Sequence, residues 1–329
     1  MILEGKKLIL ATKPFAKEER SRSWMHTIST LVLLIISYVS IFVVDPLVIK
    51  IIFCLLTSLI SLRMFIIYHD YLHKTILQNS ALANIIFTLF GLYILSPRSV
   101  WKRSHDYHHK HNSKLFTSSV GSFPIVTYAK FKSFKKSDRR AYLFIRHPLT
   151  IMLGHVFTFT FGLSLLPLMR SPDKHWDAAI ALVLHYSLAV AIYLTCGPLN
   201  FALGFLMPAL ISGAMGSYLF YAQHNFPGTQ FEDKEGWTYI SAAMNSSSYM
   251  KMNKVMHWFT GNIGYHHIHH LNARIPFYRL PEAFKKIPEL QTAKTTSLNP
   301  IEIGKCLRLK VWDTDAQSMI GHREMAAKM

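Results

Sequence analysis

The 329-residue chain is half hydrophobic, has only 16% charged residues and carries a formal net charge of +18. This composition excludes an ordinary soluble domain and is typical of a protein that crosses the membrane several times. Lipid headgroups, and no nucleic acid, are therefore the expected partners of the excess basic residues.

Two apolar runs near the N-terminus predict a helical hairpin in the membrane. A bilayer core of about 30 Å requires roughly 20 apolar residues per helix. Residues 24–44 and 47–68 meet this length, and only Asp45-Pro46 separates them. The second run continues directly into His69, which we therefore expect at the membrane surface. No small-residue cleavage site follows the first run, which indicates an uncleaved span.

Four further apolar runs follow along the chain. Residues 83–95 are apolar but too few to span a bilayer, so this run is predicted to lie in the interface or to re-enter. The runs 149–168, 178–196 and 199–222 are each close to spanning length. Length alone therefore does not say which of these three runs cross the membrane.

The distribution of basic residues predicts the orientation. Six Lys and Arg residues precede the first run, twelve lie in 97–147 and thirteen follow His224, whereas the turns near Asp45 and at 169–177 carry few. By the positive-inside rule, both termini and all the histidine clusters are expected in the cytoplasm.

This orientation requires an even number of crossings between residue 147 and His224, so one of the three runs must fail to span. We expect that run to be 178–196, which contains His185 and ends at Gly197-Pro198. Pro208 interrupts the last run as well, and that alternative stays open.

The predicted fold is thus an all-α integral membrane protein with about four transmembrane helices. Re-entrant or interfacial helices and a cytosolic helical cap that carries the histidines complete it. We expect a cytosolic N-terminal segment at 1–23, a membrane domain at 24–290 and a cytosolic C-terminal tail at 291–329.

Half of the eighteen histidines form four clusters along the chain. The clusters are His69-x3-His73, His105-x2-His108-His109, the single His224, and His266-x2-His269-His270. Residues three or four apart share one face of a helix, so each multiple cluster directs its imidazoles toward one point. Imidazole is a good ligand for iron, copper or zinc, and eight or nine exceed what one ion can use. The spacing therefore predicts two metal ions, although a single such motif is often an ordinary surface histidine pair.

Two carboxylates lie beside these clusters, since Asp70 follows His69 and Asp106 follows His105. A carboxylate commonly accepts the second ring N–H of a ligand histidine and holds its tautomer. Asp70 and Asp106 are candidates for that role, with a solvated charge or a helix cap as the alternative. His111 and His267 adjoin clusters but do not share their spacing.

Three histidine boxes in this order resemble the membrane fatty-acid desaturase and hydroxylase superfamily. The resemblance is strongest in GNIGYHHIHHLNARIPFYRLPEA at 261–283, and WTYISAAMNSSSYMKMNKVMHWFT at 237–260 is similar to bacterial acyl-lipid desaturases. SVGSFPIVT at 119–127, after the second box, is similar too. The resemblance covers about residues 30 to 290.

The resemblance implies an oxygen-dependent enzyme with two ferrous ions, and it adds His224 to the ligands found by spacing. The implied ligands are His69, His73, His105, His108, His109, His224, His266, His269 and His270. Acyl-CoA desaturases of known structure have an asparagine four residues before the histidine that matches His224. This chain has Phe220 there, so a water-mediated contact from that position to iron is not expected.

The resemblance further implies that the substrates are acyl chains of membrane lipids, and we expect the protein in a bacterial inner membrane. Phe201, Leu203, Phe205 and Met207 could line the path of the chain or face the lipid as ordinary residues. No haem-binding segment is evident, so electrons are expected from a separate ferredoxin or cytochrome-b5-type carrier. The basic residues at 130–140 could bind that carrier or lipid headgroups.

Two alternative functions use the same histidines. A hydroxylase or ketolase of a carotenoid or another lipid would share the two-iron site and differ in the product. A histidine-rich metal transporter would need polar ligands in the middle of its spans. The histidine clusters lie at the ends of nearly uncharged runs, which disfavours transport, with His155 and His185 as the residues to check.

Overall fold

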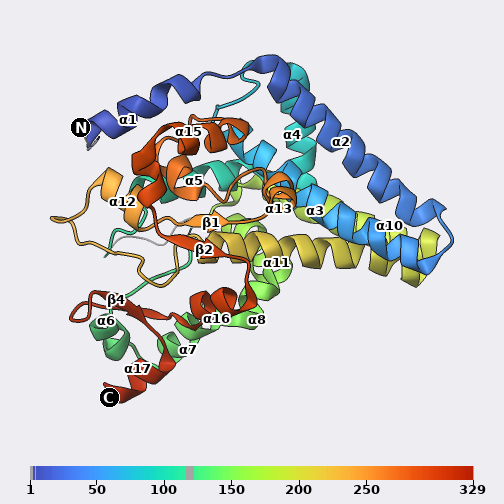
Figure 1. The fold of residues 1–329 in the computed structure, drawn as a ribbon. Coiled ribbons are helices and arrows are strands. Elements are labelled where there is room, and N and C mark those ends of the chain that lie inside the picture. Colours follow the sequence, from blue (N-terminus) through green and yellow to red (C-terminus); the bar gives the residue numbers. More distant parts are fainter. Residues whose placement is uncertain (1–2, 4, 116–121, 329) are drawn as a thin grey trace.

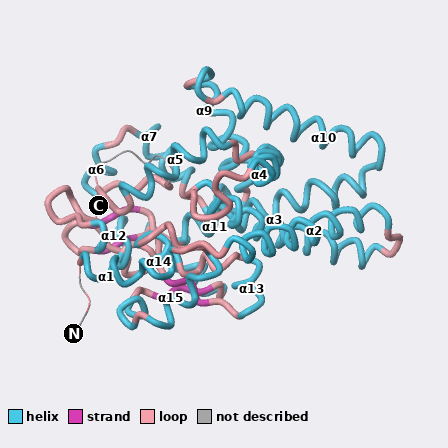
Figure 2. The backbone as a smooth tube through the Cα atoms, turned by 90° about the horizontal axis from the view of Figure 1, so that it is seen from above, coloured by secondary structure: helices cyan, strands magenta, loops and turns pink. Residues whose placement is uncertain are grey.

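Four long apolar helical segments extend side by side from a cap of shorter helices (Figure 1, Figure 2). The structure is a computed structural model that describes residues 3, 5–115 and 122–328, so the first three residues of the similar stretch at 119–127 lie outside it. The long segments are α2 (Arg20–Val43), α3 (Leu47–Leu72), α10 (Trp176–Phe201) and α11 (Met207–Ala222). The prediction of a mostly helical membrane protein is confirmed, and α2 and α3 form the predicted hairpin.

At the end of this bundle away from the cap, polar contacts join the connection between α2 and α3 to the connection between α10 and α11. Lys50 at the start of α3 donates to the backbone oxygen of Ile41 at 3.0 Å and to Oδ1 of Asn200 at 2.8 Å. At the opposite end, α3 runs into the first histidine cluster and α11 runs into His224. The four segments therefore alternate in direction between these two ends.

A sharp reversal at Gly197 joins α10 to the segment that returns toward the cap. Gly197 has φ 79° and ψ 171°, a conformation open to glycine alone at ordinary cost. Pro198 follows and starts the returning segment, which passes through the π-helical turn Ala202–Leu206 into α11. The glycine and proline thus divide one continuous apolar stretch into two antiparallel helices.

Substituting Gly197 with alanine is expected to lower the free energy of unfolding by about 1–3 kcal/mol, because a Cβ strains this backbone conformation. Thermal unfolding of the protein in detergent, followed by circular dichroism, measures the effect. The matched control is Gly304→Ala, since Gly304 is helical and a Cβ there meets open space. Equal stability of the two variants would contradict the strain argument.

The short apolar run after α3 forms α4 (Ala81–Tyr93), and the chain then turns by 89° into α5 (Arg98–His111). α4 has 13 residues, and α5 is polar and carries the second histidine cluster. This shape matches the predicted re-entrant or interfacial run. Leu95, fully buried with φ 55°, lies at the bend.

The run 149–168 enters the bundle and turns back. Just before this run, Arg146 contacts Tyr221 near the cap end of α11. Gly154 lies deeper along the same helix, because a Cβ on it would be 2.3 Å from the backbone oxygen of Gly213. Eight residues of helix correspond to about 12 Å. The chain then returns toward the cap end, where the Ser164 hydroxyl donates to the backbone oxygen of Leu95 at the bend before α5.

The run that fails to cross is therefore 149–168, and the prediction that 178–196 fails is wrong. The turn after 149–168 packs against α5 at the cap end, where the Ser99 hydroxyl donates to Asp177 at 2.5 Å. α10 starts there and reaches the far end, where its Asn200 accepts from Lys50. The expected position of 169–177 opposite the histidines is wrong for the same reason. Hydropathy could not separate the two runs, because the close approach of Gly154 to α11 depends on tertiary packing.

Shorter elements complete this part of the chain and the cap. The re-entrant part comprises α8 (Pro148–Met152), the π-helix His155–Leu165, α9 (Leu166–Arg170) and the 3-10 turn Pro172–Lys174. The remaining helices are α1 (Lys6–Thr12), α6 (Tyr128–Ser133), α7 (Lys136–Ile145), α12 (Tyr239–Asn245), α13 (Lys254–Phe259), α14 (His266–Leu271), α15 (Leu280–Lys286), α16 (Pro300–Arg308) and α17 (His322–Ala327). Single 3-10 turns lie at Lys13–Ala16, Phe277–Arg279 and Pro288–Thr292.

Among the described residues, four short strands depart from a purely helical fold. β1 (Tyr249–Lys251) pairs in parallel with β2 (Thr295–Ser297), and β3 (Val311–Asp313) pairs antiparallel with β4 (Ser318–Ile320). At three residues each, they are too short for period-2 alternation to reveal them in the sequence. β2, β3 and β4 lie in the C-terminal segment, which is folded onto the rest of the chain.

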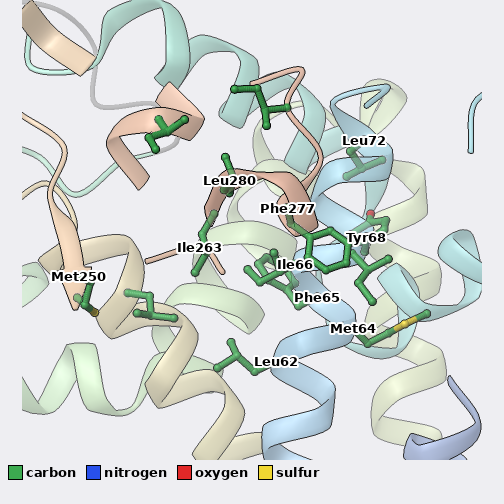
Figure 3. Close-up of a cluster of buried hydrophobic side chains, with 14 of the residues drawn as sticks. Leu62, Met64, Phe65, Ile66, Tyr68, Leu72, Met250, Ile263, Phe277 and Leu280 are labelled. Carbon is green, nitrogen blue, oxygen red and sulfur yellow. The ribbon is translucent and has the colours of Figure 1, made fainter. Parts of the chain in front are cut away.

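The main hydrophobic core surrounds the cap end of α3. From Leu62 to Leu72 this helix is buried on nearly all sides, which explains why its sequence shows little amphipathic pattern. Figure 3 shows these side chains against Ile263, Phe277 and Leu280, which flank the third histidine cluster. Packing of the core thus holds the first and third clusters together.

Candidate metal centre

The nine histidines singled out by spacing and resemblance meet in two adjacent groups at the cap end of the bundle. The first group contains His69, His73, His105, His109 and His269, and the second contains His108, His224, His266 and His270. Within each group the candidate ligand atoms all lie within 4.8 Å of one another. The structure thus brings together every histidine of the predicted set and divides it into two sites, as two metal ions would require.

Helical geometry explains how two of the clusters serve both groups. On α5, His105 and His109 are four residues apart and point to the first group, while His108 points to the second. On α14, His266 and His270 share the second group, while His269 points to the first. The HxxHH spacing therefore places candidate ligands for two ions on one short helix, and the rings of His109 and His270 stack at 4.3 Å where the groups meet.

The imidazoles of the first group converge through their Nε2 atoms. The Nε2 of His69 lies 2.8 Å from that of His105 and 3.2 Å from that of His73. The Nε2 of His109 lies 3.1 Å from that of His105 and 3.0 Å from that of His269. Two Nε2 atoms in contact can share at most one proton. Several of these convergent Nε2 lone pairs therefore have no hydrogen-bond donor from the protein.

The second group has the same geometry around His224. The Nε2 of His224 lies 3.0 Å from that of His108 and 2.8 Å from that of His266, whose own Nε2 is 3.1 Å from that of His270. On the opposite side of its ring, His224 Nδ1 lies 2.9 Å from the backbone oxygen of Ser246. That contact holds Nδ1 as the protonated nitrogen and leaves Nε2 free to bind a cation.

Burial keeps these imidazoles neutral, which is the form that binds metals. Removal from water lowers the pKa of His73 and of His224 to about 4. For the other ligand candidates on α5 and α14, burial and the neighbouring imidazoles hold the pKa well below the usual range. These convergent nitrogens, all but that of His73 on buried side chains, therefore suit a pair of divalent cations.

The two candidate carboxylates occupy different surroundings. Asp70 is buried, with one oxygen 3.2 Å from His69 Nδ1 and the other accepting the backbone N–H of Phe277 at 2.7 Å. Asp106 is partly exposed and accepts a hydrogen bond from Lys102 at 2.5 Å. Asp70 thus contacts a histidine of the first group directly, whereas Asp106 acts on His73 through its charge alone.

Four further histidines that the sequence raised as possible ligands lie outside both groups. His111 stacks on Tyr107 and contacts the backbone of its own helix. His267 is fully buried, and its Nε2 lies 2.9 Å from the backbone oxygen of Leu290. His155 and His185 form a pair of rings 5.1 Å apart inside the bundle. Their spacing did not predict a metal role, and none of the four joins the two groups.

Several residues around the groups carry no spacing signal and could not be found from the sequence. Trp101 stacks on His105 with ring centroids 4.8 Å apart, and Phe220 packs on Trp101 at 5.3 Å. Phe220 thus supplies an apolar wall in place of a polar contact. Ser246, which orients His224, is brought close only by the fold.

A partly open cavity lies beneath this aromatic layer, between α3, the end of α4, α10, α11 and the re-entrant segment, and both His155 and His185 line it. Phe65 lines it and packs edge-on against Trp101 at 5.1 Å, so the cavity reaches toward His105. Ala209 and Ser212 line it from α11, 15 and 12 residues before His224. The four residues considered for the acyl path, Phe201, Leu203, Phe205 and Met207, do not line this cavity.

The fold and the site define an integral membrane protein with a histidine-rich site for two metal ions. The fatty acid desaturase family model matches residues 46–300. A fatty acid desaturase of Bacillus subtilis (strain 168) is 31% identical over 79% of this chain and 74% of its own length.

Two cyanobacterial proteins are more distant relatives. The sn-1 oleoyl-lipid 12-desaturase of Anabaena variabilis is 22% identical over 83% of this chain and 78% of its own length. The sn-1 acyl-lipid omega-3 desaturase (ferredoxin) of Nostoc sp. (strain 36) is 23% identical over 72% and 66%. This chain belongs to the fatty acid desaturase family. It is an oxidoreductase, and the predicted activity is confirmed.

Proposed function

We propose that this desaturase introduces a double bond into acyl chains of membrane lipids, with two ferrous ions bound by the two histidine groups. The observation that carries the proposal is the convergence of nine neutral imidazoles near a cavity that is lined mainly by apolar side chains. The five histidines of the first group would hold one ion and the four of the second group the other. Asp70 would orient His69 by accepting a hydrogen bond from its Nδ1–H group.

The reaction converts a saturated –CH2–CH2– unit, O2, two electrons and two protons into –CH=CH– and two molecules of water. An unactivated methylene has no acidic proton, so side chains acting as acids or bases cannot begin this reaction. When bound, the iron pair supplies the activation of O2 that C–H cleavage requires. The chain's own residues must position the methylene group and exclude water.

The aromatic layer is suited to both tasks. Trp101 covers the face of His105, and Phe65 connects this layer to the cavity. We propose that the acyl chain passes Phe65 and that its methyl end occupies the cavity. Apolar walls stabilise the chain by about 25 cal/mol per Å² of buried surface and keep bulk water from the reacting carbons.

The membrane placement follows from the same features. We propose that the histidine groups and both termini face the cytoplasm of a bacterial cell, with residues 24–290 as the desaturase domain between the N-terminal segment 1–23 and the C-terminal tail 291–329. The charge distribution supports this orientation, because the turn at 169–177 with its basic residues now lies on the histidine side.

A soluble electron donor would then reach the cap. The exposed basic residues of α6 and α7 would form a surface for an acidic ferredoxin, and the name of the Nostoc relative also includes ferredoxin.

We expect a Lys135→Glu/Lys136→Glu variant to reduce turnover with ferredoxin about tenfold at low salt through a slower association rate, because steering by charge raises that rate. Turnover at rising ionic strength measures the effect, and the variant should lose the salt dependence of the unmodified enzyme. Equal salt dependence of both would contradict the dock and favour headgroup binding.

Expression in a host whose lipids lack unsaturation tests the reaction. Gas chromatography of fatty-acid methyl esters should show a new monounsaturated ester. A hydroxylated ester in its place would point to the hydroxylase alternative. Unchanged lipids together with altered metal uptake would contradict the proposal and favour transport.

A further inference from the structure

The turn that carries His224 is held on both sides by side-chain hydrogen bonds. Gln223 Nε2 donates to the backbone oxygen of Ile263 at 2.9 Å, and Asn225 Nδ2 donates to that of Cys306 at 2.8 Å. All three consecutive residues are buried. Because His224 comes from a turn after α11 and not from a helix, its ring position depends on these neighbours.

Arg146 is the central contact of this turn on the side away from the metal groups. It is fully buried (0% exposed), and its guanidinium donates to Asn225 Oδ1 and to the Tyr221 hydroxyl at 3.1 Å. It also donates to the backbone oxygens of Pro124 at 2.8 Å and Leu309 at 3.3 Å. Among the described residues, no carboxylate forms an ion pair with it. Burying a charge without a counter-ion costs free energy, so the buried position of Arg146 calls for an explanation.

The second half of the contact comes from the C-terminal segment. Lys310 is 3% exposed and donates to the backbone oxygens of Arg146 at 2.6 Å and Leu307 at 2.7 Å. The Tyr142 hydroxyl donates back to the oxygen of Lys310 at 2.6 Å. The residues 306–310 lie beyond the range that matches the family model, which ends at residue 300.

We propose that residues 306–310 form a C-terminal brace that positions His224 for metal binding through Arg146 and Asn225. Cys306 binds Asn225 directly, and Leu309 and Lys310 bind Arg146, which binds Asn225 in turn. Asn225 is next to His224, so a shift of this turn moves the imidazole that lies at the centre of the second group. Arg146 is thus a positioning residue, and the brace acts on one of the two metal sites.

The proposal rests on metal binding by the two groups and not on the reaction that they perform. The test uses the full chain purified in detergent and titrated with Fe²⁺ under anaerobic conditions, with bound iron counted per chain. Arg146→Gln and Asn225→Leu are each expected to lower the affinity for one of the two Fe²⁺ ions about 10–100-fold and to leave the affinity for the other unchanged. Replacing the partners of metal ligands has effects of this size in other proteins. Asn225→Asp, which keeps the acceptor for Arg146, should recover most of the affinity.

Three comparisons make the assignment specific. In a His69→Ala/His73→Ala background, which leaves only the second group intact, Arg146→Gln should weaken the remaining tight site by the same factor of about 10–100. The double variant Arg146→Gln/Asn225→Leu should bind no more weakly than either single variant, because both act through one contact. Arg323→Gln, which replaces an exposed arginine of α17 outside the brace, is the matched control and should bind two ions as before.

If the affinities for both ions fall in parallel, Arg146 has a general role in folding and the proposal is overturned. The proposal is also overturned if Arg146→Gln binds both ions with unchanged affinity. Should Arg146→Gln not fold, Asn225→Leu decides by the same criteria. An unmodified protein that binds fewer than two ions would overturn both the brace and the proposed metal centre. One that binds two ions but leaves host lipids unchanged would contradict only the proposed reaction.

Discussion

Replacing His266 with alanine is expected to abolish desaturation and to remove one of the two metal ions, while the adjacent His267 tolerates replacement. His266 Nε2 lies 2.8 Å from His224 and 3.1 Å from His270 at the centre of the second group. Its loss leaves three imidazoles for that ion. Since O2 activation requires the complete pair, we expect the rate to fall about a thousandfold or more, equivalent to at least about 4 kcal/mol in the barrier.

The neighbouring residue provides a stringent control, because it has the same chemistry and the same helix. His267 contacts the backbone oxygen of Leu290 and takes no part in either group. In His267→Gln a side-chain amide can still donate to Leu290, so we expect two bound ions and near-normal amounts of unsaturated ester. Iron content per chain and ester analysis in the same expression host measure both variants. Similar losses in the two would show that the third box acts through folding and not as two distinct metal-binding faces.

The contrast between these neighbours also shows what spacing can predict. Eight of the nine grouped histidines were identifiable because residues three or four apart share a helical face. His267 was set aside by the same rule, and the structure places it outside both groups. His224 has no partner at helical spacing, so only the family resemblance indicated it. Its place at the centre of the second group depends on the tertiary position of α11.

The topology was predictable only in part, for a physical reason. Hydropathy finds apolar runs, but the runs 149–168 and 178–196 are alike in length and composition. The re-entrant path depends on the close approach of Gly154 to Gly213, where side chains would collide. Arg146 was equally hidden, since among twelve basic residues of its loop nothing in the sequence marks the one that is fully buried.

Filling the cavity beneath the aromatic layer is expected to shorten the acyl chains that the enzyme accepts without disturbing the metal centre. Ala209 and Ser212 line the cavity from α11, with Ser212 three residues nearer to His224. Three residues of helix correspond to about 4.5 Å. Ser212→Phe should therefore exclude shorter chains than Ala209→Phe does, and both variants should reduce the unsaturated fraction of the longest chains most strongly.

The measurement is the ratio of unsaturated to saturated ester at each chain length, in a host supplied with saturated acids of several lengths. We expect about a tenfold fall for the longest chains, because a bulky ring in a filled cavity costs about 1–3 kcal/mol. Val190→Phe is the matched control, since Val190 lies on the exposed face of α10. Iron content should remain at two ions per chain in all three variants. A uniform fall at every chain length would mean that the acyl chain does not enter this cavity, whereas a graded fall that follows the depth of the substitution places its methyl end there.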